Sequence, residues 1–335
     1  MPVVTVLIAV LNGAQTVRRA IASAQEQSEK DIEILIVDDG STDNTAEIIQ
    51  NLAARDPRIR LVRMEQNQGA AAASNIGIEQ AQGEWIAILD SDDWWKSKRL
   101  ETLLATASQT NADVVCDNLE IYDHMRKAIV EQTRFCANNR PFVLDTETYF
   151  KRDNPLWRHS IGYIQPVMRR DFLRKHKVKY NVSHRFGFDF IFVAELLLHK
   201  AKLVVVPDAM YVYVHRISPT TRKISPFSRS EAGHAMIVRG CRELLKKYSA
   251  TMTPDERKAL EERRSIFEAR VKCDDLLQAV EKFRLLDAAR QLMRTPMMIV
   301  LIIATLAKLV YANVLSLNVM LKKHKKQPLF ITNLT

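Results

Sequence analysis

The sequence predicts an α/β fold: a mostly parallel sheet with flanking helices, followed by a helical C-terminal appendage. Over the first hundred residues, apolar β-branched runs alternate with segments of helical spacing, which is typical of parallel strands joined by crossover helices. From Pro226 onward the chain is rich in Glu, Lys, Arg and Leu and favours helix. A length of 335 residues fits one α/β domain with an appendage.

The first strand is expected at Val3–Val10, and the apolar positions of Thr16–Gln25 recur at helical spacing. Ile32–Val37 is an almost continuous apolar run, so this strand is expected to be covered on both faces. The remaining elements of this region are a helix at Thr45–Ala54, a strand at Ile59–Val62, a helix at Gly69–Gln80 and a strand at Trp85–Leu89.

Beyond Leu100 the pattern weakens. Asn118–Pro155 is polar and shows no regular period, so no elements are predicted there. The expected elements are a helix to about Gln109, a strand at Asp113–Cys116, a helix at Phe186–His199 and separate strands at Leu203–Val206 and Met210–Val214. The predicted domains are 1–222, a helical extension at 223–295 and an apolar segment with a basic tail at 296–335.

Two acidic clusters follow expected strands directly: Asp38-Asp39-Gly40-Ser41-Thr42-Asp43 and Asp90-Ser91-Asp92-Asp93. In open α/β sheets ligands bind at the carboxyl ends of the strands, so both clusters are expected to open into one crevice. Oxygen ligands in an Asp-x-Asp arrangement suit Mg²⁺ or Mn²⁺, which commonly bind substrate phosphates as well. The second cluster therefore predicts a diphosphate-bearing substrate, with helix capping as its alternative.

The first cluster has two interpretations. A carboxylate can accept the N–H of a pyrimidine ring, so Asp39 is a candidate for binding a uracil base. The same residues also suit a turn that caps the following helix.

An ordered set of motifs resembles the family 2 inverting glycosyltransferases, and among them the bacterial succinoglycan-type exopolysaccharide glucosyltransferases. The resemblance is strong over about the first 105 residues and weaker to about residue 220. It implies a Rossmann-like GT-A fold, a UDP-sugar donor, a Mg²⁺ or Mn²⁺ cofactor and inversion at the anomeric carbon. The motifs are Val4–Ile8, Asn12, Val37–Asp43, Asn67–Gly69, Asn75–Ile78 and Gly83–Asp93.

The resemblance also implies roles for single residues. Asp39 would contact the base, and Asp90 and Asp92 would face the metal, the ribose and the diphosphate. Asp92 is favoured as the direct metal ligand, with Asp90 and Asp93 left open. The family usually has Pro-x-Tyr-Asn where this sequence has Ala9-Val10-Leu11-Asn12, so Ala9 is placed at the donor and an aromatic contact to the nucleotide is expected to be missing.

Asp189 matches the family's general base, which takes the proton of the acceptor hydroxyl. Phe188 stands where the family usually has Glu. Phenylalanines at 186, 188, 190 and 192 are expected to exclude water from Asp189 and to raise its pKa. The alternative is a carboxylate that only stabilises a helix N-terminus.

The segment Tyr211–Ser218 resembles the family segment that closes over the diphosphate. His215 or Arg216 would bind a phosphate oxygen there by a charge-assisted hydrogen bond. A surface histidine without a role is the alternative.

The C-terminal segment Met297–Leu321 is mostly apolar and is followed by Lys322-Lys323-His324-Lys325-Lys326. Its length suffices to span a bilayer, but Lys308 would cost about 2.5–3.5 kcal/mol near the centre. A span, an in-plane amphipathic helix, a hairpin in one leaflet and a buried packing helix remain open. We expect the basic tail to hold the chain on the cytoplasmic face of the bacterial inner membrane, where the acceptor implied by the resemblance is a polyprenyl-diphosphate-linked oligosaccharide.

Charge and cysteine content narrow the function classes. Residues 1–110 hold 10 Lys and Arg against 16 Asp and Glu, whereas the remainder holds 39 against 23, so the basic charge lies in the back of the chain. It is not interleaved with an aromatic stacking platform, so no nucleic-acid partner is expected. The four cysteines show no C-x-x-C spacing, which argues against zinc and for a reducing compartment.

The sequence argues against two other enzyme classes and leaves one non-catalytic function open. The glycines form no G-x-G-x-x-G, which argues against a dinucleotide-dependent oxidoreductase. An aspartate-nucleophile phosphatase would carry its acidic motif after the first strand, where this chain has Asn12. A non-catalytic nucleotide-sugar-binding or scaffold subunit of a membrane polysaccharide complex remains the alternative, because Phe188 departs from the family pattern.

Overall fold

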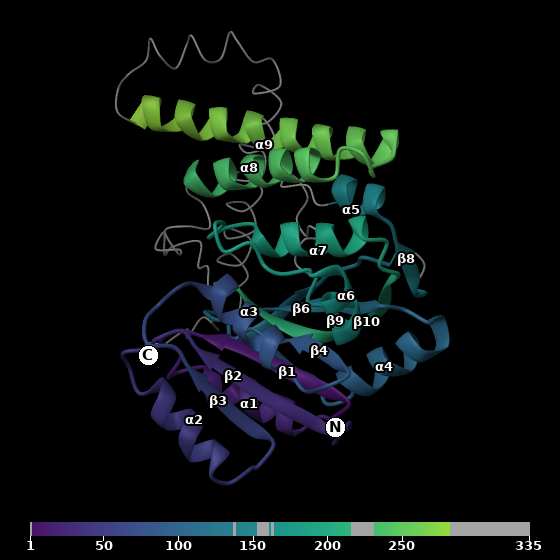
Figure 1. The fold of residues 1–335 in the computed structure, drawn as a ribbon. Coiled ribbons are helices and arrows are strands. Elements are labelled where there is room, and N and C mark those ends of the chain that lie inside the picture. Colours follow the sequence, from purple (N-terminus) through teal and green to yellow (C-terminus); the bar gives the residue numbers. More distant parts are fainter. Residues whose placement is uncertain (1, 137–138, 153–160, 162–163, 216–230, 282–335) are drawn as a thin grey trace, which may run out of the picture. The chain divides into compact units, whose positions relative to one another are not determined.

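The computed structural model describes residues 2–136, 139–152, 161, 164–215 and 231–281 (Figure 1). The chain divides into two compact units, Met1–Phe267 and Glu268–Thr335. In the second unit the described residues form the last part of one helix. The domain boundaries predicted after residues 222 and 295 lie outside the described residues.

The described strands form one mixed sheet with the order β3-β2-β1-β4-β9-β6-β10-β5, in which β7 pairs with β6 and β8 with β10. The first four strands in space run parallel, and β9 is antiparallel to both of its neighbours. The strand bounds are β1 Val4–Val10, β2 Ile32–Asp38, β3 Ile59–Arg63, β4 Trp85–Ile88, β5 Trp94–Trp95, β6 Val114–Asp123, β7 Ala128–Gln132, β8 Phe142–Leu144, β9 Val167–Arg169 and β10 Leu203–His215.

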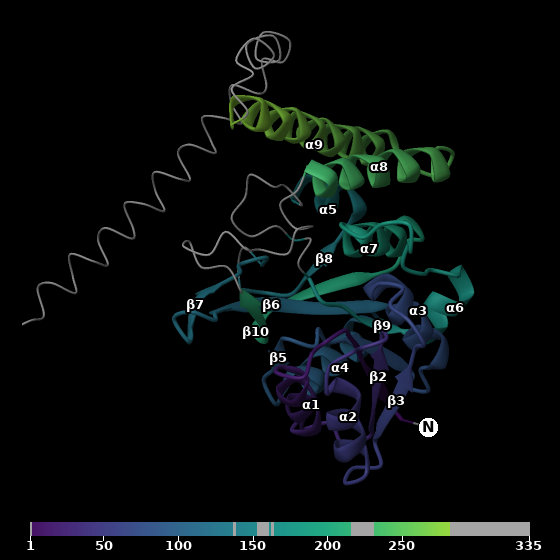
Figure 2. The same ribbon diagram turned by 90° about the vertical axis from the view of Figure 1, so that its left-hand side faces the viewer.

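Helices flank this sheet, and α5, α7 and α8 pack on one another beside it (Figures 1 and 2). Gly240 allows α8 to approach α7, because a Cβ there would lie 2.7 Å from Cδ1 of Ile191. The helix bounds are α1 Val17–Gln25, α2 Thr45–Ala53, α3 Ala70–Gln80, α4 Arg99–Thr110, α5 Thr146–Arg152, α6 Arg170–His176, α7 Phe188–Leu198, α8 Glu231–Lys247 and α9 Pro254–Glu281.

The first hundred residues fold as their pattern predicts. All seven residues of β2 are buried, so both faces of this strand are covered, as its continuous apolar run requires. The helix α3 lies close to β1, because a Cβ on Gly77 would stand only 2.1 Å from Cδ1 of Leu7. A small residue at this position lets the helix and the strand approach each other.

The middle of the chain differs from the prediction. The region from 118 to 155, expected to be irregular, holds the second half of β6 together with β7, β8 and α5. The expected strands on either side of Pro207 are one long strand, β10, which shifts register between Val206 and Ala209 and again before Tyr211. The irregularity absorbs Pro207, whose carbonyl accepts a hydrogen bond of 2.6 Å from Asn118 Nδ2.

The helices expected after Pro226 are confirmed for the described residues as α8 and α9, with a break between Lys247 and Pro254. Among the residues that the structure describes, no helix combines the length and the hydrophobicity needed to cross a bilayer. The apolar stretch at 297–321 lies outside those residues.

Candidate functional site

The two acidic clusters lie at the same edge of the sheet. β1 runs parallel to β2 on one side and to β4 on the other. Asp39 follows β2 and donates its backbone N–H to Val10 O at 2.8 Å, while Leu89 follows β4 and donates to Leu7 O at 3.0 Å. Asp39 and Asp90 therefore stand at strand ends separated only by the end of β1, as the sequence predicted.

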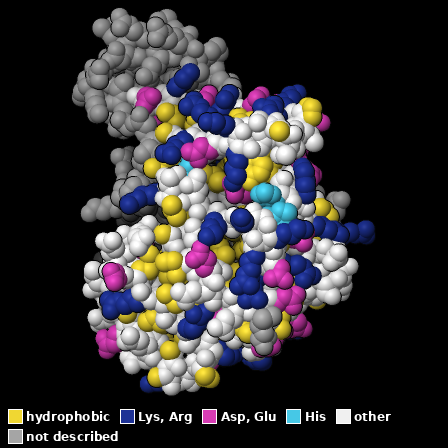
Figure 3. Space-filling model, viewed as in Figure 1, with side chains coloured by type: hydrophobic (Ala, Val, Ile, Leu, Met, Phe, Trp, Pro, Cys, Tyr) yellow, Lys and Arg dark blue, Asp and Glu magenta, His cyan; other side chains and the backbone are white. Residues whose placement is uncertain are grey.

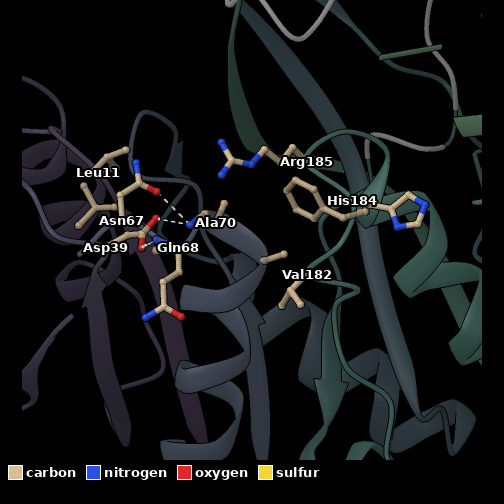
Figure 4. Close-up of a pocket in the computed structure, with 13 residues that line it drawn as sticks. Leu11, Asp39, Asn67, Gln68, Ala70, Val182, His184 and Arg185 are labelled. Atoms are coloured by element: carbon tan, nitrogen blue, oxygen red, sulfur yellow. Dashed lines mark hydrogen bonds between the residues drawn. The ribbon is translucent and has the colours of Figure 1, made fainter. Parts of the chain in front are cut away.

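Asp39 organises the loop that precedes α3. Its side chain is buried and accepts backbone N–H groups from Gln68 at 2.7 Å and from Gly69 at 2.8 Å (Figure 4). Gly69 has a φ of 96°, a backbone conformation that favours glycine. Asp39 thus has a structural role that sequence reasoning did not assign: it holds the loop before α3.

The neighbouring loops are joined by Asn12. Its Oδ1 accepts the backbone N–H of Thr42 at 2.9 Å, and its own N–H donates to Ser41 Oγ at 2.8 Å. Asp43 accepts the N–H of Thr45, the first residue of α2, at 3.0 Å. Desolvation opposes its ionisation, but hydrogen bonds from Thr45 and Ala14 hold the pKa of Asp43 below the usual value. The motif residues Asn12, Ser41, Thr42 and Asp43 therefore hold the loops after β1 and β2 together by hydrogen bonds. These bonds stabilise the backbone around Asp39.

A cavity of about 250 Å³ opens beside Asp39. One wall comes from the ends of β1 and β2 and the start of α3, and the other from the segment that leads into α7 (Figure 4). Figure 4 shows Arg185 reaching from the second wall towards Asn67 on the first. Among the described residues Arg185 has no ion-pair partner, and its positive charge suits an anionic ligand. The lining residues are Ala9, Val10, Leu11, Asp39, Asn67, Gln68, Gly69, Ala70, Ala71, Val182, His184, Arg185 and Phe188.

The cavity is lined by an aromatic side chain, although the position where the family usually has tyrosine carries leucine. Leu11 stands where the family usually has tyrosine, and it is 41% exposed at the cavity. Phe188, which stands where the family usually has glutamate, lines the opposite wall. A flat apolar surface is therefore available to a ligand, but it comes from α7 and not from the end of β1. Ala9 also lines the cavity.

The carboxylates of the second acidic cluster differ in burial and in hydrogen bonding. Asp93 is buried, and its two oxygens accept hydrogen bonds from Tyr211 Oη at 2.8 Å and Val214 N at 2.7 Å. Asp90 is partly exposed and accepts one hydrogen bond from Gln165 Nε2 at 2.9 Å. Asp92 offers its backbone carbonyl to Arg19 Nη2 at 2.5 Å. Asp93 thus anchors β10 with both of its oxygens.

Asp189 is near this cluster. The pKa of Asp90 is raised well above its usual value by desolvation and then by the negative charges of Asp93, Asp189 and Asp92. Asp189 is the second residue of α7, and its side chain is open to solvent next to Phe188. Desolvation by the surrounding protein raises the pKa of Asp189 to about 7, which is the predicted direction. The predicted cause is wrong, because the exposed side chain is not shut off from water by the phenylalanines.

The backbone turn before α7 determines how the helix that carries Asp189 begins. Gly187 directly precedes α7 with a φ of 71°, so the chain enters the helix abruptly. Phe190 and Phe192 are buried on the core side of the helix, which leaves Asp189 on the solvent side. Phe192 stacks on Tyr180 at 4.0 Å between ring centroids. The pKa of this tyrosine is raised by burial and by the charges of Asp189 and Asp90, so all three side chains belong to one site.

Two further candidates are His215 and Arg216. His215 is the last residue of β10, opposite Asp123 in the register, and Arg216 lies outside the described residues. Sequence reasoning missed Gln165, Tyr180 and Arg185. Their only signal was position, since the last two precede Gly187 and Gln165 lies just before β9.

The residues present fit a hard divalent cation. In the described part of the chain no three His, Cys, Asp or Glu side chains come together as a complete metal site. Mg²⁺ commonly binds through one or two carboxylates and completes its coordination with substrate phosphates and water. Asp90 and Asp92 would supply such a pair. The pKa of Asp90 is raised by desolvation and then by the negative charges of Asp93, Asp189 and Asp92, and a cation would offset this charge.

Comparison with known proteins identifies the family. Residues 5–197 match the family described as Glycosyl transferase family 2, and this match covers more than half of the chain. The chain belongs to this family.

Two relatives in family 2 come from Rhizobium meliloti (strain 1021). The succinoglycan biosynthesis protein ExoO is 33% identical over 218 residues, which cover 64% of this chain and 61% of ExoO. The succinoglycan biosynthesis protein ExoU is 32% identical over 242 residues, which cover 70% of this chain and 69% of ExoU. This chain therefore spans about three fifths of the length of ExoO.

Solved structures support the fold. The crystal structure of S. aureus TarS superimposes with a TM-score of 0.60 at 19% identity, covering 81% of this chain and 43% of that chain. TarS 1–349 in complex with UDP gives a TM-score of 0.57 at 18% identity, covering 87% of this chain and 89% of that chain. The predicted GT-A fold and family are thus confirmed.

Proposed function

We propose that this chain transfers a hexose from a UDP-sugar to a lipid-linked oligosaccharide during exopolysaccharide biosynthesis, with inversion at the anomeric carbon. The observation that carries the proposal is the juxtaposition of Asp90 and Asp189, whose charges interact although the residues are far apart in sequence. Asp90 marks the donor side and Asp189 the acceptor side of one reaction centre. Glucose is the first donor sugar to test, from the resemblance to the succinoglycan proteins.

The nucleotide is proposed to lie along the edge of the sheet. Asp39 would accept the ring N–H of uracil, next to the apolar surfaces of Leu11 and Phe188. Arg185, from the opposite wall, would supply positive charge to the anionic donor. TarS, which shares this fold, has been solved with UDP and with UDP-GlcNAc.

Asp90 and Asp92 would hold Mg²⁺ or Mn²⁺ against the diphosphate. Such a cation would neutralise charge that develops on the leaving diphosphate. Asp189 would take the proton of the acceptor hydroxyl while its oxygen bonds to the anomeric carbon and the bond to the diphosphate oxygen breaks. The nucleotide diphosphate leaves with the electron pair, and attack opposite the leaving group inverts the anomeric carbon.

The acceptor is proposed to be a polyprenyl-diphosphate-linked oligosaccharide at the cytoplasmic face of the inner membrane. The support is the sequence of the apolar stretch Met297–Leu321 and the basic residues that follow it. Deleting residues 297–335 should release the protein from the membrane pellet at low salt. A truncated protein that still sediments with membranes would contradict this part of the proposal.

The enzymatic role is tested with Asp189→Asn. Membranes containing the protein are incubated with a panel of labelled UDP-sugars, and label is measured in the lipid fraction. We expect one sugar to be transferred by the wild type, and transfer to be lost in the variant while UDP binding persists. Asp171→Asn is a matched control, because Asp171 is likewise the second residue of a helix and is exposed. A wild type that binds UDP but transfers nothing from any donor would favour the scaffold alternative.

A further inference from the structure

We propose that Gln165 is a positioning residue that fixes the Asp90 carboxylate for the cation-bound diphosphate, and that one buried ion pair, Arg99–Asp117, supports it. The inference rests on the proposed function and adds residues outside the motifs of the family resemblance. It starts from a hydrogen bond that reaches Asp90 from the segment before β9.

Gln165 donates a hydrogen bond to one carboxylate oxygen of Asp90 and not to the other. Its Nε2 donates to Asp90 Oδ2 at 2.9 Å, and in the described part of the chain this is the one hydrogen bond that the Asp90 carboxylate accepts. An amide donor fixes the orientation of the carboxylate without adding a positive charge that would compete with a cation. Asp90 Oδ1 is then held ready for the ligand.

Gln165 is itself fixed through its backbone. Arg99 Nη2 donates to Gln165 O at 2.8 Å, and the same guanidinium donates to Asp117 Oδ1 from Nε at 3.0 Å and from Nη2 at 2.8 Å. Both ionic side chains are 0% exposed. The guanidinium also lies over the rings of Trp95, at 4.6 Å, and Tyr211, at 5.1 Å. Such an enclosed ion pair has little freedom to move.

The same ion pair reaches the acidic loop by a second route. Asp117 Oδ2 accepts the N–H of Met210 at 3.1 Å on β10. The next residue, Tyr211, donates its hydroxyl to Asp93 at 2.8 Å and accepts the N–H of Asp90 at 3.1 Å. Arg99 and Asp117 thus fix the backbone of Asp90 through one arm and its carboxylate through the other.

This arrangement explains why ionic groups are retained in the core. A buried ion pair is weak support for stability, because well-packed apolar residues often replace it without loss. Here Arg99 on α4 and Asp117 on β6 hold the Gln165 backbone and Met210 on β10. Gln165 itself and Tyr211, the residue after Met210, contact Asp90. The network therefore serves the geometry of the acidic loop.

The test uses Gln165→Met, which keeps the length of the side chain and removes its donor. Gln82→Met, at an exposed position, is the control. Binding of Mn²⁺ in the presence of UDP is measured by electron paramagnetic resonance, UDP binding in EDTA by calorimetry, and unfolding by a thermal melt. We expect the Mn²⁺ Kd to rise about 10- to 100-fold in Gln165→Met, as for other residues that orient metal ligands. UDP binding without metal and the Tm should stay close to wild type.

A second variant, Tyr211→Phe, removes only the hydroxyl of the other arm and should also weaken Mn²⁺ binding. An unchanged Mn²⁺ Kd in Gln165→Met would overturn the inference, as would a lower Tm with an unchanged Kd, which is what a purely structural role predicts. A wild type that binds neither UDP nor Mn²⁺ would instead count against the proposed function itself.

Discussion

Asp39→Asn tests whether this residue has one role or two. In the structure its buried carboxylate accepts two backbone N–H groups, from Gln68 and Gly69. An asparagine keeps one acceptor oxygen and turns an amide donor towards the second N–H. The substitution therefore loses one hydrogen bond to a charged group, a cost of about 1.5–3 kcal/mol.

These energies predict two measurable changes. At roughly 2–4 °C per kcal/mol for a domain of this size class, the Tm should fall by roughly 3–12 °C. Loss of a ring N–H contact would add a similar cost to binding, so the Kd for UDP should rise roughly 10- to 150-fold. Thermal melts and calorimetry with UDP measure the two effects separately.

Glu65→Gln is the matched control, because Glu65 lies in the loop that contains Gln68 and Gly69, carries the same charge as Asp39 and is exposed. It should leave both the Tm and the Kd near the wild-type values. An Asp39→Asn protein with an unchanged Tm would refute the assigned loop contacts. A lower Tm with an unchanged Kd for UDP would show that Asp39 only supports the loop.

Three further predictions follow from the site and the fold. Because transfer needs Asp189 deprotonated and its pKa is about 7, kcat/KM should be flat above pH 7 and fall about tenfold per pH unit below it; a profile without this decline would exclude Asp189 as the base. Arg185→Gln should weaken UDP binding about tenfold and leave the binding of uncharged uridine nearly unchanged, since only UDP carries phosphates; calorimetry that shows equal losses for both ligands would contradict an anion-binding role. Gly83→Ala should destabilise the protein by at least about 1–3 kcal/mol, because its Cβ would stand 2.4 Å from the backbone nitrogen of Thr5 on β1; a wild-type melt would show that β1 can shift away.

Local pattern was sufficient for the front half of the sheet. All seven residues of β2 are buried and five of them are apolar, so most of this strand can be recognised from composition alone. Its two charged residues, Glu33 and Asp38, are buried as well, and the partners of Glu33, Thr5 Oγ1 and Arg60 Nε, are known only from the structure. The strand end could be placed because acidic residues follow the apolar run. Placing Asp39 and Asp90 at one edge then needed only the rule for parallel strands.

The middle of the chain could not be predicted in this way. β6 and β10 are adjacent in the sheet although they are about ninety residues apart in sequence, and their pairing stabilises segments whose own pattern is weak. Pro207 looked like the end of a strand, but a change of register and Asn118 accommodate it within β10. The stabilisation of β6 and β10 thus comes from residues that are close in space but distant in sequence.

Local composition and motif residues were enough to assign the fold family, the order of the first strands and helices, and the candidate carboxylates Asp39, Asp90 and Asp189. How these carboxylates are used became clear only from the folded chain. Both oxygens of Asp93 accept hydrogen bonds from β10. Asp39 accepts two backbone N–H groups of the loop before α3, and Asp90 accepts a hydrogen bond from Gln165. The physical reason is that a side chain's free acceptors depend on the donors that long-range packing brings to it, and no spacing within the chain records them.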